Sequence, residues 1–141
     1  MSDEIAATPT ASTGWSASIQ AFIRRRRRTL LGLWLISMVA VVVGSLVPEL
    51  APPEGRIAFL PIDKLIHVGA YAGLAFLPQV ALARFRPATV AALSMILLGG
   101  AIEIAQSFTP GREGSFDDAI ANALGVLAGI ALGLRMCPPG T

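Results

Sequence analysis

TLLGLWLISMVAVVVGSLV, residues 29–47, is a run of nineteen residues without a charged side chain. As an α-helix rising about 1.5 Å per residue, it spans roughly 28 Å, enough for the hydrocarbon core of a bilayer. Five arginines, residues 24–28, precede the run, and Pro48 follows it. Because a basic run holds its end of an apolar helix in the cytoplasm, and no A-x-A cleavage pattern follows, we expect a retained signal anchor.

The composition favours the same class of protein. Of 141 residues, 54% are hydrophobic and 14% are charged, which is too apolar for an ordinary soluble domain. The net charge of +2 does not indicate a nucleic-acid partner, because five of the eleven basic residues lie in the one arginine run. Cys137 is the only cysteine, so an intramolecular disulfide and a CxxC motif are both excluded.

The expected fold class is all-α, a polytopic bundle of four transmembrane helices. The spans are predicted over residues 29–47, 63–83, 88–107 and 116–135. The remaining segments are predicted to be a disordered cytoplasmic tail at 1–28, an irregular outer loop at 48–62, and a short tail at 137–141. An even number of spans and the basic clusters predict that both termini lie in the cytoplasm, in a bacterial inner membrane.

Local signals place the helix ends. Pro61 should keep the loop from continuing into the second span, and Pro87 suits the first turn of the third. Pro110 with Gly111 breaks the chain after the third span. Ser115 is predicted as the N-cap of the fourth helix, with Asp118 completing an acidic variant of the capping box.

Polar residues within spans are costly, and here they gather at one side of the predicted membrane. Helical spacing puts those of the second span on a single face, and those of the third within an arc of roughly 60°. They are Asp63, Lys64, His67 and Tyr71 in the second span, Glu103 and Gln106 in the third, Asp117, Asp118 and Asn122 in the fourth, and Arg112 and Glu113 in the loop. We expect them to line a shallow pocket on the outer side.

The fourth span also carries Gly125, Gly129 and Gly133, a doubled small-xxx-small pattern that permits close helix contact. These glycines share an arc of about 80° with Asp118 and Asn122. The pattern predicts that the fourth helix lies inside the bundle, and it also allows association with another membrane protein.

The ordered motifs resemble those of the VanZ-like membrane proteins. They read Asp63-Lys64-x-x-His67-x-x-x-Tyr71, then Glu103-x-x-Gln106, then Pro110-Gly111-Arg112-x-x-Ser115-x-x-Asp118-x-x-x-Asn122-x-x-Gly125. The resemblance covers residues 61–134, and we assign 61–136 to a VanZ-like domain. Val68 stands where the family often has an aromatic residue. The founding member is associated with teicoplanin resistance, so the resemblance implies a cell-envelope role but supplies no biochemical activity.

Several of these residues suit binding or catalysis. His67 beside Lys64 and Glu103 is a titratable imidazole between charges of both signs, which suits proton transfer, with His67 or Glu103 as the base. Lys64 and Arg112 could clamp a phosphate or carboxylate. The structural alternative is that Lys64 pairs with Asp63, Arg112 with Glu113, and that Asn122 bridges helices.

The cluster contains five acids and two bases, which weakens a simple anion site and permits a divalent cation such as Mg²⁺, Mn²⁺ or Ca²⁺. Without a metal-ligand spacing, we assign no metal ligand, and no cofactor is required by the sequence. The remaining ligand candidates are Asp63, Tyr71, Gln106, Ser115, Asp118 and Asn122.

Three functions stay open at this stage. The first is recognition or modification of an outer-leaflet lipid or glycan headgroup. The second is a non-enzymatic scaffold that assembles through glycine faces. The third is a transporter, against which the inner half offers no matching polar stripe.

Overall fold

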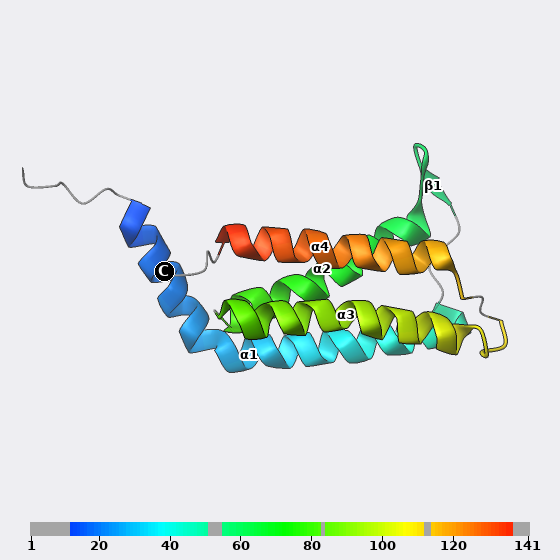
Figure 1. Ribbon diagram of the computed structural model, residues 1–141, viewed down its shortest axis with the longest axis horizontal. Coiled ribbons are helices and arrows are strands. Elements are labelled where there is room, and N and C mark those ends of the chain that lie inside the picture. The colour runs from blue at the N-terminus through cyan, green and yellow to red at the C-terminus, as the bar shows by residue number, and fades with distance from the viewer. Residues whose placement is uncertain (1–11, 51–54, 83, 112–113, 137–141) are drawn as a thin grey trace, which may run out of the picture.

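The computed structural model describes residues 12–50, 55–82, 84–111 and 114–136. Within these residues the chain forms four long α-helices that run along one another (Figure 1), and α2 contacts each of the other three. The elements are α1 (Ser12–Leu46), the 3-10 turn η1 (Pro48–Leu50), β1 (Arg56–Ile57), β2 (Leu60–Pro61), α2 (Ile62–Leu82), α3 (Phe85–Gln106) and α4 (Phe116–Met136).

Each α-helix contains a segment long and apolar enough to cross a membrane, and this confirms the predicted four-helix membrane fold. The segments are Arg25–Leu46, Ile62–Leu82, Arg86–Gln106 and Phe116–Met136. Large apolar side chains stay exposed along them, for example Val39, Leu97 and Leu127. A soluble protein would bury such surfaces, whereas lipid chains cover them at no cost.

The first helix is longer than predicted. Residues 12–28 were expected to belong to a disordered tail, but they form the first half of α1. Figure 1 shows this half leaving the bundle. Its sequence contains no proline, and alanine and arginine are good helix formers, so the helix nucleated in the apolar run extends backward at one hydrogen bond per residue. Residues 1–11 and 137–141, predicted as tails, lie outside the described residues.

The predicted irregular loop also contains regular structure. Pro48–Leu50 makes a 3-10 turn, and β1 pairs antiparallel with β2, with Ile57 opposite Leu60 and Arg56 opposite Pro61. The hairpin closes through Ala58, whose φ is 56°. Figure 1 shows the hairpin standing out sideways from the bundle, directly before α2.

Glycines bring α4 against α2. A Cβ on Gly125 would overlap the carbonyl oxygen of Val68, and one on Gly129 would overlap that of Ala72. Gly133 packs in the same way against the side chain of Gln79. The predicted small-residue stripe therefore forms a contact within the chain, as expected for small-xxx-small packing.

A proline in α2 and a tryptophan in α1 connect these two helices. Pro78 lies inside α2 and has no N–H, so the carbonyl of Leu74, four residues earlier, lacks its helical donor. The indole Nε1–H of Trp34 donates a hydrogen bond of 2.9 Å to this carbonyl. The partner that the helix cannot supply thus comes from its neighbour.

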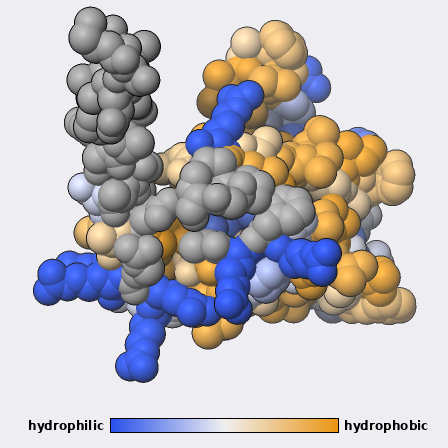
Figure 2. Space-filling model, turned by 60° about the vertical axis from the view of Figure 1, so that its left-hand side comes forward, coloured by the Kyte–Doolittle hydropathy of each residue, from blue (hydrophilic) through white to orange (hydrophobic). Residues whose placement is uncertain are grey.

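The two ends of the bundle differ in charge. At one end, called the basic end, lie the exposed arginines 25–28, 84, 86 and 135. Figure 2 looks toward this end and shows hydrophilic side chains around it. At the other end, called the network end, α1 and α3 finish and α2 and α4 begin.

Candidate functional site

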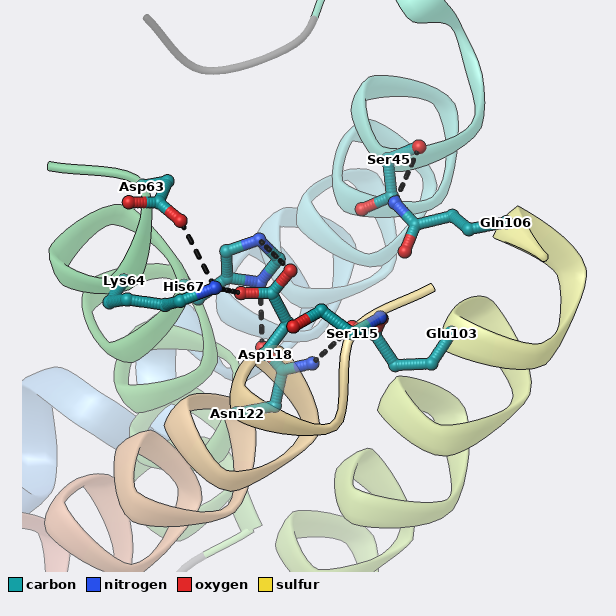
Figure 3. A network of polar contacts seen from close by, with 9 residues as sticks. All are labelled: Ser45, Asp63, Lys64, His67, Glu103, Gln106, Ser115, Asp118 and Asn122. Carbon is teal, nitrogen blue, oxygen red and sulfur yellow. Dashed lines mark hydrogen bonds and ion pairs between the residues drawn. The ribbon is translucent and has the colours of Figure 1, made fainter. Parts of the chain in front are cut away.

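The polar residues predicted to gather do so at the network end. Figure 3 shows side chains from α2, α3 and α4 pointing toward one another, and beside them Gln106 directed to Ser45 of α1. Seven of these residues form a polar network: Asp63, Lys64 and His67 of α2, Glu103 of α3, Ser115 before α4, and Asp118 and Asn122 of α4.

Lys64 joins α2 to α4 by ion pairs. Its Nζ lies 3.1 Å from Asp63 Oδ2 and also forms a hydrogen bond with Asp118 Oδ1. The pairing with Asp63 was the structural alternative for this lysine, and the pairing with Asp118 was not foreseen. With two carboxylates around one ammonium, Lys64 is balanced within the protein and is a poor candidate for clamping a phosphate.

His67 is oriented by a chain of side chains that crosses the bundle. Its Nδ1 lies 2.9 Å from Asn122 Oδ1, and Asn122 Nδ2 lies 3.4 Å from Glu103 Oε1. Because the amide hydrogens face the carboxylate, the amide oxygen faces the ring, and His67 Nδ1–H is the donor. In the neutral ring, Nε2 then carries the lone pair.

The free side of the imidazole faces a carboxylate at longer range. His67 Nε2 lies 3.9 Å from Asp118 Oδ2, too far for a hydrogen bond but close enough for an ion pair if the ring is protonated. Among the described residues Nε2 has no hydrogen-bond partner. The arrangement leaves one ring nitrogen able to accept a proton from a ligand.

Glu103 also fixes the start of α4. Its Oε2 accepts a hydrogen bond of 2.9 Å from the backbone N–H of Ser115. The predicted capping box is wrong in this respect, because Asp118 turns to Lys64 and the carboxylate of α3 takes its place. Gly114 makes this possible, since a Cβ there would overlap the carbonyl oxygen of Glu103 and the hydroxyl of Ser107.

Two further predicted residues lie beside the polar network. Gln106 Nε2 donates a hydrogen bond of 2.8 Å to the carbonyl of Ser45 in α1. Tyr71 is 1% exposed, and its hydroxyl lies against Gly99, where a Cβ would come within 3.2 Å of it. With His67, these two side chains line a cavity of about 260 Å³ next to α1.

The other predicted residues are not part of the polar network. Asp117 is exposed at the first turn of α4. Arg112 and Glu113 lie outside the described residues. Within the described ranges no group of three histidine, cysteine, aspartate or glutamate side chains is placed to hold a metal ion.

Sequence reasoning missed the contributions of α1 and of the loop before α4. Ser45 acts through its backbone carbonyl, which no side-chain pattern reveals. Gly114 could have been suspected, because a glycine directly before a helix cap often marks a close approach of two backbones.

Four apolar spans joined by buried polar side chains define a multi-pass α-helical membrane protein. The family model described as VanZ/LLP1 matches residues 9–136, and the chain belongs to this family. The match extends beyond the motif region at 61–134 and takes in α1. No curated protein and no solved structure matches the chain in the other two comparisons.

Proposed function

We propose that this protein binds the polar headgroup of a cell-envelope lipid or glycan at the polar network, and that His67 contacts the ligand. The observation that carries the proposal is the orientation of His67. Asn122 and Glu103 hold Nδ1, while Nε2 has no hydrogen bond to a described residue. The His67 side chain is 15% exposed, so a ligand at this end of the bundle can reach the open nitrogen.

The charges around the imidazole favour a ligand that offers a hydroxyl or amine hydrogen. Lys64 is occupied by Asp63 and Asp118, so the described part of the polar network offers an anion little free positive charge. A hydroxyl can donate to His67 Nε2, and Asp118 at 3.9 Å would stabilise the ring if it took up that proton. The same geometry would let His67 serve as a general base in a headgroup modification.

Glu103 has a different role in this proposal from that of a base. Both of its carboxylate oxygens are engaged, one by the Ser115 N–H and the other by Asn122. It is therefore a positioning residue that acts through Asn122 on His67.

The arginines of the basic end support one orientation of the protein in the membrane. Seven exposed arginines lie there, at 25–28, 84, 86 and 135, and the positive-inside rule favours the cytoplasm for such an end. In a bacterial inner membrane, both termini would then be cytoplasmic and the polar network would face the outer leaflet. A C-terminal fusion to green fluorescent protein should fluoresce, and one to alkaline phosphatase should be inactive. The reverse pattern would refute the orientation.

The function is tested by replacing His67→Ala and Glu103→Gln in the native host and measuring membrane abundance together with growth under envelope stress. Both variants should reach the membrane in wild-type amounts, but cells that carry them should lose the wild-type growth under envelope stress. Glu49→Gln is the matched control, because Glu49 is an exposed acid in η1 at the same end of the bundle. A full wild-type phenotype in both network variants would sink the proposal.

The alternative function is a scaffold that binds other membrane proteins through glycine faces. Gly125, Gly129 and Gly133 are already occupied by α2, whereas Gly69 and Gly73 form a second glycine pair that is open to another protein. Both of these are exposed, and a Cβ there would meet nothing within 4 Å. If Gly69→Leu abolished the phenotype while His67→Ala preserved it, the scaffold function would replace the first.

A further inference from the structure

The cavity beside α1 has mostly apolar walls. Its volume is about 260 Å³, and its apolar lining comes from Ala40, Val41 and Gly44 of α1, Ile66 and Ala70 of α2, and Leu50 of η1. It is smaller than a typical pocket for a whole small molecule, which begins at roughly 300 Å³. A cavity of this size and lining suits part of a lipid chain, with the rest of the molecule in the bilayer.

Two buried polar atoms on the residues that line this cavity have no partner. The hydroxyl of Tyr71 and the Oε1 of Gln106 make no hydrogen bond within the described residues. Their side chains are well shielded, since Tyr71 is 1% and Gln106 is 5% exposed. Buried polar atoms without a partner are rare, because each one costs free energy, so both atoms call for a partner that the described residues do not supply.

We propose that this cavity binds a lipid alcohol, with the hydrocarbon chain against α1 and the hydroxyl group hydrogen-bonded to Gln106 and Tyr71. This inference rests on the proposed function, because His67 lines the same cavity, and it names the chemical class of the ligand.

The hydrogen-bonding capacity of the two atoms selects an alcohol. Gln106 Oε1 can only accept, so it requires a ligand that donates. The Tyr71 hydroxyl can donate as well as accept, and an alcohol oxygen provides the complementary acceptor. A phosphate diester or an ester group has no hydrogen to give, and a pure hydrocarbon satisfies neither atom.

The position of the cavity fits a ligand at the boundary of the membrane. Gln106 is the last residue of α3, and Leu50 belongs to the turn that follows α1, so the cavity lies at the network end. The alcohol group would thus sit near the headgroup level, with His67 on the same side. A hydroxyl group bound there would lie near the His67 side chain, which lines the same cavity.

The experiment uses oleyl alcohol and its methyl ether, which have the same chain and differ in the hydrogen that the alcohol can donate. Each is titrated into the purified full-length protein in detergent, and the bound fraction is measured by native mass spectrometry. The alcohol should bind about tenfold more tightly than the ether, the factor expected when a buried acceptor is left without its donor. Equal binding of the two probes would overturn the inference.

Two variants locate the binding at this cavity. Gly44→Leu places a side chain into the cavity, and Gly32→Leu is the matched control on the same helix outside it; a Cβ at either glycine meets nothing within 4 Å. Only Gly44→Leu should weaken alcohol binding, again about tenfold or more. Tyr71→Phe should weaken the binding of the alcohol and of the ether alike, because both probes carry an oxygen that accepts from the Tyr71 hydroxyl. Equal effects of the two leucine variants would refute the location.

The two proposals fail in different ways. If Glu103→Gln loses the envelope phenotype but the wild type shows no preference for the alcohol, the ligand class is wrong and the proposed function stands. If the alcohol preference is found and depends on Gly44, while His67→Ala and Glu103→Gln keep the full phenotype, the headgroup function is wrong and the cavity remains a lipid-alcohol site.

Discussion

The hydrogen bond between Trp34 and Leu74 makes a quantitative prediction about how α1 is held on the bundle. Trp34→Phe keeps an aromatic ring but removes the Nε1–H donor, which lies 2.9 Å from the Leu74 carbonyl. Pro78 offers no N–H to replace it. A net hydrogen bond contributes about 0.5–1.5 kcal/mol, and interhelical bonds in membrane proteins average about 0.6 kcal/mol. We therefore expect the lost hydrogen bond to lower the free energy of unfolding of Trp34→Phe by about 1 kcal/mol.

A double-mutant cycle separates this part from the smaller size of phenylalanine. Pro78→Ala restores a backbone donor to the Leu74 carbonyl, so Trp34→Phe should cost about 1 kcal/mol less in that background, or roughly a factor of five in the unfolding constant. The packing loss of the ring is the same in both backgrounds and cancels.

Unfolding by sodium dodecyl sulfate in mixed micelles, followed by circular dichroism, measures the four free energies of the cycle. Pro87→Ala is the control, because Pro87 lies in the first turn of α3, where no intrahelical donor is missing. Coupling between Trp34 and Pro87 should be absent. A coupling of zero between Trp34 and Pro78, or an equal coupling with Pro87, would refute the assignment of the indole as a replacement donor.

Three other outcomes are expected. Gly129→Ala should lower the free energy of unfolding by about 1–3 kcal/mol, because the added methyl group overlaps the α2 backbone. Gly73→Ala is the control: its methyl group meets nothing, so the free energy of unfolding should stay unchanged or rise by up to about 1 kcal/mol. Equal unfolding free energies of the two variants in detergent would contradict the packing. Asn122→Leu should lower the free energy of unfolding by about 2–5 kcal/mol in the same assay, because it leaves both the His67 Nδ1–H and the Glu103 carboxylate without this partner. An unchanged unfolding midpoint would show that Asn122 does not bridge the two side chains. Tyr71→Phe should stabilise delipidated protein by about 1 kcal/mol or more, since its hydroxyl has no partner, and a loss of stability would reveal a hidden structural hydrogen bond.

The membrane fold could be predicted because its causes are local in the sequence. An uncharged run such as residues 29–47 has few alternatives to a membrane span, and Pro87 and Ser115 mark helix starts by their own chemistry. The prediction of a tail at 12–28 was wrong for a related reason. Composition indicates whether a segment has enough apolar residues to form a buried core. Residues 12–28 form a helix without such a core, because the neighbouring span has already nucleated the helix that they extend.

The polar network could be predicted as a cluster but not as a set of bonds. Helical periodicity brings Asp63, Lys64 and His67 to one face. Periodicity does not predict that Asp118 binds Lys64, 54 residues earlier, instead of capping its own helix. Which of the two contacts Asp118 makes depends on the distance between α2 and α4. Glycines set that distance, and their packing against backbone carbonyls appears only in three dimensions.

The cavity was the least predictable feature, since α1 lines it with Ala40, Val41, Gly44 and Ser45, and the contact of Ser45 with Gln106 is made by a backbone oxygen. Its unpaired atoms nevertheless say most about function. Phenylalanine at position 71 would fill nearly the same volume as Tyr71 without the cost of an unpaired hydroxyl, so bundle stability alone does not account for the tyrosine. The charged pairs of the polar network do not give the same discrimination, because each has a partner that structure alone could require. The hydroxyl of Tyr71 and the Oε1 of Gln106 therefore offer a cleaner distinction between a stabilising role and a ligand-binding role than the charged residues beside them.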